Sequence, residues 1–98
     1  MRLPKNRPPE HPGEILREEF VKPLGLTQEK LAAALGISFR RVNEIMNGKR
    51  SVTAETALLL ASYFKTTAAL WMNLQAGYDL YAARKRLERS GHKLAVTT

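Results

Sequence analysis

Arginines and a carboxamide group lie close together just before the middle of this 98-residue chain, where Arg40, Arg41 and Asn43 fall within four positions. An arginine side chain can donate two hydrogen bonds to guanine O6 and N7 or pair with a phosphate, and an asparagine can pair with adenine. Arg40 and Arg41 suit either of these roles, and Asn43 suits a base or the nucleic-acid backbone. The alternative is that all three are only solvated residues of a helix.

Four further residues around this group have side chains that fit DNA. Gln28 stands at the expected start of a helix, where free backbone N–H groups attract a phosphate. Lys49 and Arg50 follow the arginine cluster and are best interpreted as phosphate contacts. Phe39 is the exception, because a hydrophobic side chain there either packs inward or touches a thymine methyl group.

The remaining reactive residues do not form a catalytic or metal-binding group. His11 and His92 lie in the segments that we expect to be least rigid, and the spacing of His11 and Glu14 gives only two ligands in a chain arm. There is no glycine-rich phosphate loop, no nucleophile elbow and no carboxylate pair in an apolar context. The sequence therefore predicts a protein that is not an enzyme and that holds no cofactor or metal.

Two short helices must position the candidate side chains. Thr27 and Ser38 each offer a hydroxyl that caps a helix N-terminus, and Gly36 between them suits a left-handed turn. The residues expected to face inward are Leu31, Ala32 and Leu35 in the first helix and Val42, Ile45 and Met46 in the second. Two helices joined through a glycine, the second with a polar outer face, are typical of a helix-turn-helix that reads DNA.

Three more helices are predicted around this pair. Pro12 and Gly13 precede a short helix that Pro23 stops, Thr53 caps a fourth helix and Thr67 caps a fifth. The apolar faces are expected to comprise Ile15, Leu16 and Phe20 in the first helix and Ala57, Leu58, Ala61 and Phe64 in the fourth. Because no segment alternates like a strand, the predicted fold is all-α with five helices.

The fifth helix carries the longest apolar line of the chain. Its members are Leu70, Trp71, Leu74, Tyr78 and Tyr81, and we predict that they form a dimer interface. At this spacing Trp71 belongs to a core or an interface rather than to a cofactor site. A two-fold dimer would place two recognition helices roughly 34 Å apart, one turn of DNA. The alternative is that this face packs only on its own domain.

The charge of the chain favours a polyanionic partner. Sixteen lysines and arginines against nine acidic residues give a net charge of +7. The cations gather in the N-terminal arm, in residues 40–50 and in residues 84–93, whereas four acidic residues lie between positions 10 and 19. Such asymmetry indicates one face for a polyanion. The alternative is that the basic ends only improve solubility.

Composition and patterning divide the chain into three parts. We predict a flexible, basic, proline-rich arm over residues 1–10, a helix-turn-helix domain with a C-terminal dimerisation helix over 11–89, and a flexible tail over 90–98. The chain has no cysteine, no apolar run long enough for a membrane span and no signal-peptide pattern. These features predict a cytoplasmic protein without a membrane partner.

Several segments together resemble a known family. They are HPGEILREEF (His11 to Phe20), PLGLTQ, NGKRSVTAETALLLASYF and WMNLQAGYDL (Trp71 to Leu80), and the similarity runs over about residues 11–85. This pattern resembles the HigA-type antitoxins, relatives of the phage-repressor helix-turn-helix proteins. The resemblance implies a dimeric, five-helix, lambda-repressor-like protein that binds operator DNA and represses its own toxin–antitoxin operon. It also implies a partner, a HigB/RelE-like messenger-RNA endonuclease toxin that the protein neutralises.

The resemblance also assigns roles to individual positions. It places Gln28 and Lys49 near phosphates, Asn43 close to the backbone, and Ser38, Phe39, Arg40, Arg41 and Glu44 at or near base edges. Family members often have prolines and arginine where this chain has Ser38-Phe39-Arg40, so the operator sequence stays open. Two alternatives remain: a stand-alone repressor without a toxin, and a protein-interaction module whose basic surface binds an acidic partner.

Overall fold

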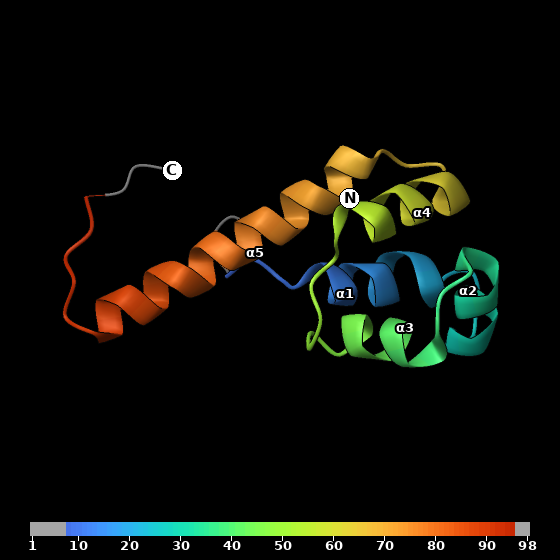
Figure 1. The fold of residues 1–98 in the computed structure, drawn as a ribbon, viewed down its shortest axis with the longest axis horizontal. Helices are drawn as coiled ribbons and strands as arrows, with labels where there is room; N and C mark the ends of the chain where they lie inside the picture. The colour runs from blue at the N-terminus through green and yellow to red at the C-terminus, as the bar shows by residue number, and fades with distance from the viewer. Residues whose placement is uncertain (1–7, 96–98) are drawn as a thin grey trace.

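A computed structural model describes residues 8–95, and within that range the backbone forms helices and no strand (Figure 1). The elements are α1 (Pro12–Ile15), which continues directly into the π-helical turn η1 (Leu16–Val21), α2 (Gln28–Leu35), α3 (Phe39–Met46), α4 (Ala54–Phe64) and α5 (Ala68–Arg89). Counting α1 and η1 as one helix, the predicted all-α fold of five helices is confirmed.

Four helices begin at the capping residues that the sequence predicts. The hydroxyl oxygens of Thr27, Ser38, Thr53 and Thr67 each accept a hydrogen bond from the backbone N–H three residues later. Such a bond satisfies one of the N–H groups that a helix start leaves unpaired. Gly36 ends α2 with φ of 72°, in the left-handed region expected of it.

The start of α1 differs from the prediction. The helix begins at Pro12 rather than after Gly13, because the Nδ1 atom of His11 accepts a hydrogen bond of 2.9 Å from the N–H of Gly13 and so caps it. His11 is only 8% exposed, and the expectation that it lies in a poorly ordered segment is wrong. A side-chain carbon at Gly13 would overlap the carbonyl oxygen of Ile45. The backbones of α1 and α3 therefore touch.

The core lies where all the helices meet. Its buried members are Ile15, Leu16, Val21, Leu31, Ala32, Leu35, Val42, Ile45, Met46, Val52, Ala57, Leu60, Trp71 and Leu74. They include every residue that was expected to face inward from α2 and α3. Trp71 is fully buried, and its indole N–H donates to the Thr66 hydroxyl at 2.8 Å. A cofactor-stacking role for Trp71 is thus ruled out by its position in the core.

The inward face of α4 was predicted incorrectly at one position. Leu58 is 63% exposed, whereas Leu60 is 1% exposed. Successive residues of a helix are about 100° apart, so Leu58 points well away from Ala57. Leu60 and Phe64 stay close to the direction of Ala57, toward α2 and α5, against which α4 packs.

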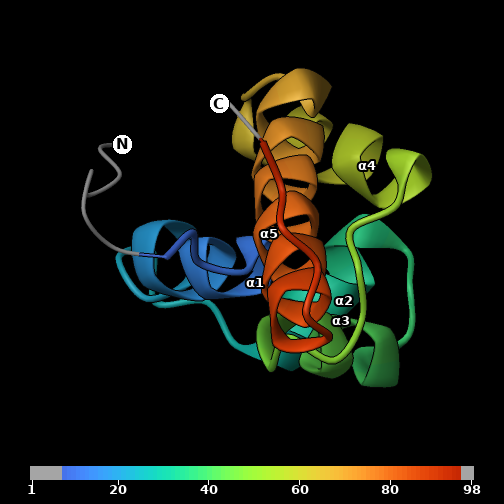
Figure 2. The ribbon, with the colours of Figure 1, turned by 90° about the vertical axis from the view of Figure 1, so that its left-hand side faces the viewer.

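The long helix α5 sets the shape of the molecule. Its first turns pack against α4, and its last turns extend beyond the other helices (Figure 1). Figure 2 shows the molecule from the side on which the last turns of α5 project, so that α5 points toward the viewer. None of the helices within residues 8–95 is long and apolar enough to cross a membrane.

Candidate nucleic-acid interface

The outer face of α3 presents two of the predicted DNA-contacting residues to solvent. The side chain of Arg40 is 84% exposed, and Phe39 is 46% exposed. Val42, Ile45 and Met46 anchor the opposite face in the core, so α3 is held with these two residues outward. The exposure of Phe39 favours contact with a thymine methyl group over packing within the domain.

Glu44 holds two arginines at this surface. Its Oε1 atom accepts hydrogen bonds from Nε and Nη2 of Arg50 at 2.9 and 2.7 Å, and its Oε2 atom accepts one from Nε of Arg40 at 3.3 Å. The hydrogen bonds from Arg50 first, and then that from Arg40, lower the pKa of Glu44. The carboxylate therefore stays charged and fixes the positions of two guanidinium groups. We call Glu44 with Arg40 and Arg50 the Glu44 fork.

Arg41 has a different environment from its neighbour Arg40. Its Nη2 atom donates to the hydroxyl of Thr56 at 3.2 Å, and Thr56 is 1% exposed at the start of α4. The Ser38 hydroxyl is also in use, since it accepts the N–H of Arg41 at 3.1 Å as the helix cap. Both residues thus position α3, and any contact with a base would come in addition to these bonds.

A chain of carboxamide side chains joins α2 to α3. Nδ2 of Asn43 donates to Oε1 of Gln28 at 2.9 Å, and Nδ2 of Asn47 donates to Oδ1 of Asn43 at 3.2 Å. Gln28 is therefore oriented by the recognition helix. Asn47 was expected to face outward but was not among the predicted DNA contacts, although it lies four residues after Asn43 on the same helix.

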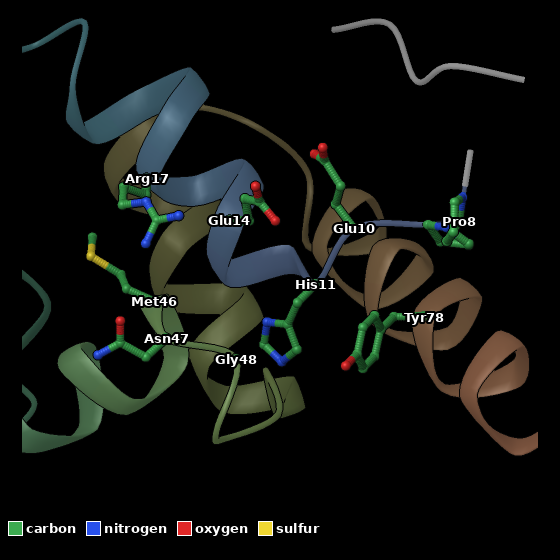
Figure 3. A pocket seen from close by; sticks show the side chains of 10 residues that line it. Pro8, Glu10, His11, Glu14, Arg17, Met46, Asn47, Gly48 and Tyr78 are labelled. Carbon is green, nitrogen blue, oxygen red and sulfur yellow. The ribbon is translucent and has the colours of Figure 1, made fainter. Parts of the chain in front are cut away.

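The loop after α3 carries Lys49 and Arg50, both exposed, and His11 supports it from one side. The His11 ring packs against Gly48 and meets the Tyr78 ring edge-on, with ring centroids 5.0 Å apart (Figure 3). Burial lowers the pKa of His11, although Asp79 and the backbone of Arg50 act in the opposite direction. A neutral histidine therefore joins α1, α5 and the loop.

The same loop is held from α5 by a buried amide. Oε1 of Gln75 accepts the backbone N–H of Val52 at 2.8 Å, while Nε2 of Gln75 donates to Asp79 at 2.9 Å. Gln75 is 5% exposed. Because a buried backbone N–H needs a partner, this bond fixes the path of the chain between α3 and α4. Gln75 was not singled out from the sequence, and His11 was considered there only as a metal ligand.

The residues predicted for a dimer interface are divided by the structure. Trp71 and Leu74 lie within the chain's own core, and Leu70 packs partly buried against it. Tyr78 and Tyr81 are half-buried farther along α5. Leu80, which was not predicted, is 72% exposed in the same part of the helix. The interface itself stays a prediction, and the later part of α5 offers it the apolar side chains of Tyr78, Leu80 and Tyr81.

The chain has a capped α2, a glycine turn and an α3 with an exposed outer face. Comparison with known protein families agrees with this arrangement. Residues 16–71, more than half of the chain, match the family described as Helix-turn-helix. The chain belongs to this family.

Helix-turn-helix relatives with long shared segments include two curated proteins. Virulence-associated protein I of Dichelobacter nodosus is 52% identical over 75 residues, which cover 76% of this chain and 69% of that protein. Antitoxin HigA-1 of Vibrio cholerae is 38% identical over 88 residues, which cover 90% of this chain and 82% of that protein.

A solved structure extends the similarity to three dimensions. The Pseudomonas aeruginosa antitoxin HigA, solved with the higBA promoter, matches with a TM-score of 0.82 and 37% identity over 91% of this chain and 99% of that chain. The resemblance to HigA-type antitoxins is confirmed by these matches.

Proposed function

We propose that this chain is a sequence-specific DNA-binding antitoxin that represses its own operon and neutralises a HigB/RelE-like messenger-RNA endonuclease. The observation that carries the proposal is the outer face of α3, where Phe39 and Arg40 stand exposed beside the Glu44 fork. The scaffold that presents them is similar to an antitoxin solved with promoter DNA.

In this proposal the side chains divide into two groups. Arg40 and Phe39 enter the major groove and read base edges, because they are exposed on the outer face of α3. Gln28, Lys49 and Arg50 flank α3 and contact phosphates, which fixes the register of the protein on the duplex. The Glu44 carboxylate reduces the repulsion between the Arg50 and Arg40 guanidinium groups. Its hydrogen bonds to them also limit where the two side chains point.

Two copies would bind a palindromic operator. A two-fold dimer repeats one recognition helix at the next turn of the same DNA face. The later part of α5, with Leu80 and Tyr81, is the apolar surface that we assign to this contact.

A binding experiment with the gene's own upstream DNA tests the DNA-binding part. We expect a gel shift with that duplex that Arg40→Ala weakens, and an affinity that falls steeply with added salt because phosphate contacts release counterions. An affinity that is indifferent to salt, or no shift at all, would favour the protein-interaction module instead.

Co-expression with the product of the neighbouring gene tests the antitoxin part. We expect that product to co-purify with this chain and to stop growth when it is expressed alone. A stand-alone repressor predicts the same gel shift with no co-purifying neighbour. The two experiments together separate the three candidate functions.

A further inference from the structure

The last turns of α5 and the residues after them form a strongly basic surface, which we call the α5 basic end. Its members are Arg84, Lys85, Arg86, Arg89 and Lys93, and Glu88 is the one carboxylate among residues 84–93. All of them except the half-buried Arg84 are exposed. The ion pair between Lys85 and Glu88 is long, at 3.9 Å, and leaves the surface with a large positive excess.

The fold does not require so many cations at this place. One or two basic residues in the last turn satisfy the helix dipole, and Arg86 and Arg89 already occupy that turn. Lys85 and Arg89 lie four residues apart, a spacing at which like charges destabilise a helix. Residues 85–95 are all exposed, so these side chains do not serve packing.

The α5 basic end is linked to the recognition unit through the middle of α5. Tyr78 contacts His11, and His11 packs on Gly48, next to Lys49 in the loop after α3. Residues 84–89 follow Tyr78 along α5 by about 9–17 Å of helix. In Figure 1 the last turns of α5 project past the other helices on the side of the loop after α3, opposite α2.

Three of the four cations of the recognition unit are held by contacts within the chain, and Lys49 is exposed. Glu44 pairs with both Arg40 and Arg50, and Arg41 donates to Thr56. A DNA duplex carries one negative charge per roughly 1.7 Å of its axis. A duplex that continues past the bases read by α3 therefore offers further phosphates to cations elsewhere on the protein.

We propose that the α5 basic end binds the phosphate backbone of duplex DNA beyond the bases that α3 reads, and that it supplies a sequence-independent part of the affinity. This inference rests on the proposed function, because it uses the placement of DNA against α3. The ligand chemistry is that of a regular row of phosphates and needs no base contact.

The test compares two double variants that remove the same charge. Lys85→Gln with Arg89→Gln changes the α5 basic end and relieves a like-charge pair. Lys22→Gln with Lys65→Asn is the matched control, since both lysines are exposed and Lys65 has φ of 59°, which asparagine tolerates. Fluorescence anisotropy over a salt series uses two duplexes, the upstream operator and a scrambled sequence of equal length.

We expect the Lys85/Arg89 variant to bind both duplexes roughly 5- to 30-fold more weakly near 150 mM salt, with a salt slope lower by about one to two units. The ratio between operator and scrambled duplex should stay that of the unmodified chain. The Lys22/Lys65 control should change by less than about twofold, because distant charges are screened. Thermal melting by circular dichroism verifies that α5 is retained in both variants.

Equal affinity and equal salt slope for the two double variants would overturn the inference. So would a Lys85/Arg89 variant that keeps its DNA binding and loses only an acidic protein partner in a pull-down. A different result, no preference of the unmodified chain for the operator, would refute the proposed function. A variant effect on the scrambled duplex would still support the α5 basic end in that case.

Discussion

Arg40 and Arg41 are adjacent in sequence and differ in what they touch. Arg40 is almost fully exposed and bonds only to Glu44 on its own helix, whereas Arg41 reaches the buried hydroxyl of Thr56 on another helix. Exposed ion pairs contribute little to folding, but a partly buried hydrogen bond from a charged group contributes more. The two arginines should therefore separate DNA binding from stability.

Replacing each arginine by alanine tests this division. Arg40→Ala should leave the free energy of unfolding within about 0.5 kcal/mol and weaken operator binding by roughly 1–3 kcal/mol, the range of a base contact. Arg41→Ala should lower the free energy of unfolding by about 1–2 kcal/mol. Urea unfolding and anisotropy on the same samples give both values.

If Arg41→Ala unfolds at the same urea concentration as the unmodified chain, its bond to Thr56 does not stabilise the domain. If Arg40→Ala binds the operator with unchanged affinity, Arg40 is a solvated helix residue and does not read DNA.

His11 makes stability depend on pH. Burial lowers the pKa of His11 in the folded chain below the 6.5 of an unperturbed histidine. Between these two pKa values the unfolded chain binds more protons at His11 than the folded chain does. Its contribution is fully present above about pH 6.5 and is lost as the pH falls from 6.5 toward the pKa of the folded state. Protonation would also remove the Nδ1 acceptor that caps Gly13.

The variant His11→Asn isolates this effect, because asparagine can cap a helix and does not titrate. Urea unfolding between about pH 7.5 and 5.5 should show a loss of stability in the unmodified chain that is clearly smaller in the variant. Parallel pH profiles for the two proteins would mean that His11 is not the group responsible.

Among the elements, α1 and α3 approach each other closely where Gly13 meets Ile45. A side-chain carbon at Gly13 would overlap Ile45, whereas one at Gly77 in α5 would meet no atom within 4 Å. Gly13→Ala should therefore destabilise the domain by about 3 kcal/mol or more, since both helices must move apart. Gly77→Ala should stabilise it by roughly 0.5–1 kcal/mol through helix propensity.

Thermal and urea unfolding of these two glycine variants give the comparison. If both variants changed stability by the same small amount, α1 would not be docked on α3 as described.

The helices were predictable where local chemistry decides them. Thr27, Ser38, Thr53 and Thr67 cap through bonds to N–H groups three residues away, and this distance is visible in the sequence. The α1 start was missed because its cap is a histidine that other elements bury. Leu58 was misplaced because the direction of α4 depends on α2 and α5, which its own periodicity does not contain.

The candidate site was predictable in its residue types and less so in their partners. The exposure of Arg40 follows from its helical position, whereas the sequence left open whether Phe39 packs inward or is exposed. The bond from Arg50 to Glu44 depends on how the loop after α3 turns back, and that of Arg41 to Thr56 depends on where α4 lies. The spacing of residues along one helix does not encode such contacts between elements.

At the scale of the whole molecule, a substitution at the exposed Leu80 tests most directly whether the chain forms a dimer through α5. A charge on an apolar contact removes its burial energy and adds repulsion across a two-fold axis. Leu80→Lys should weaken self-association roughly tenfold or more, while Leu58→Lys on α4, with a similarly exposed leucine, should not. Analytical ultracentrifugation over a concentration series measures the constants, and equal values for both variants would place the dimer contact elsewhere.

The bond between Gln75 and Val52 gives the molecule a built-in reporter. The Val52 amide proton is shielded from solvent by a side chain 23 positions away rather than by a regular helix bond. Its exchange with deuterium therefore requires that α5 and the loop after α3 separate locally. The exchange rate of this one amide would measure how often the DNA-facing loop detaches from the long helix, with no label attached to the protein.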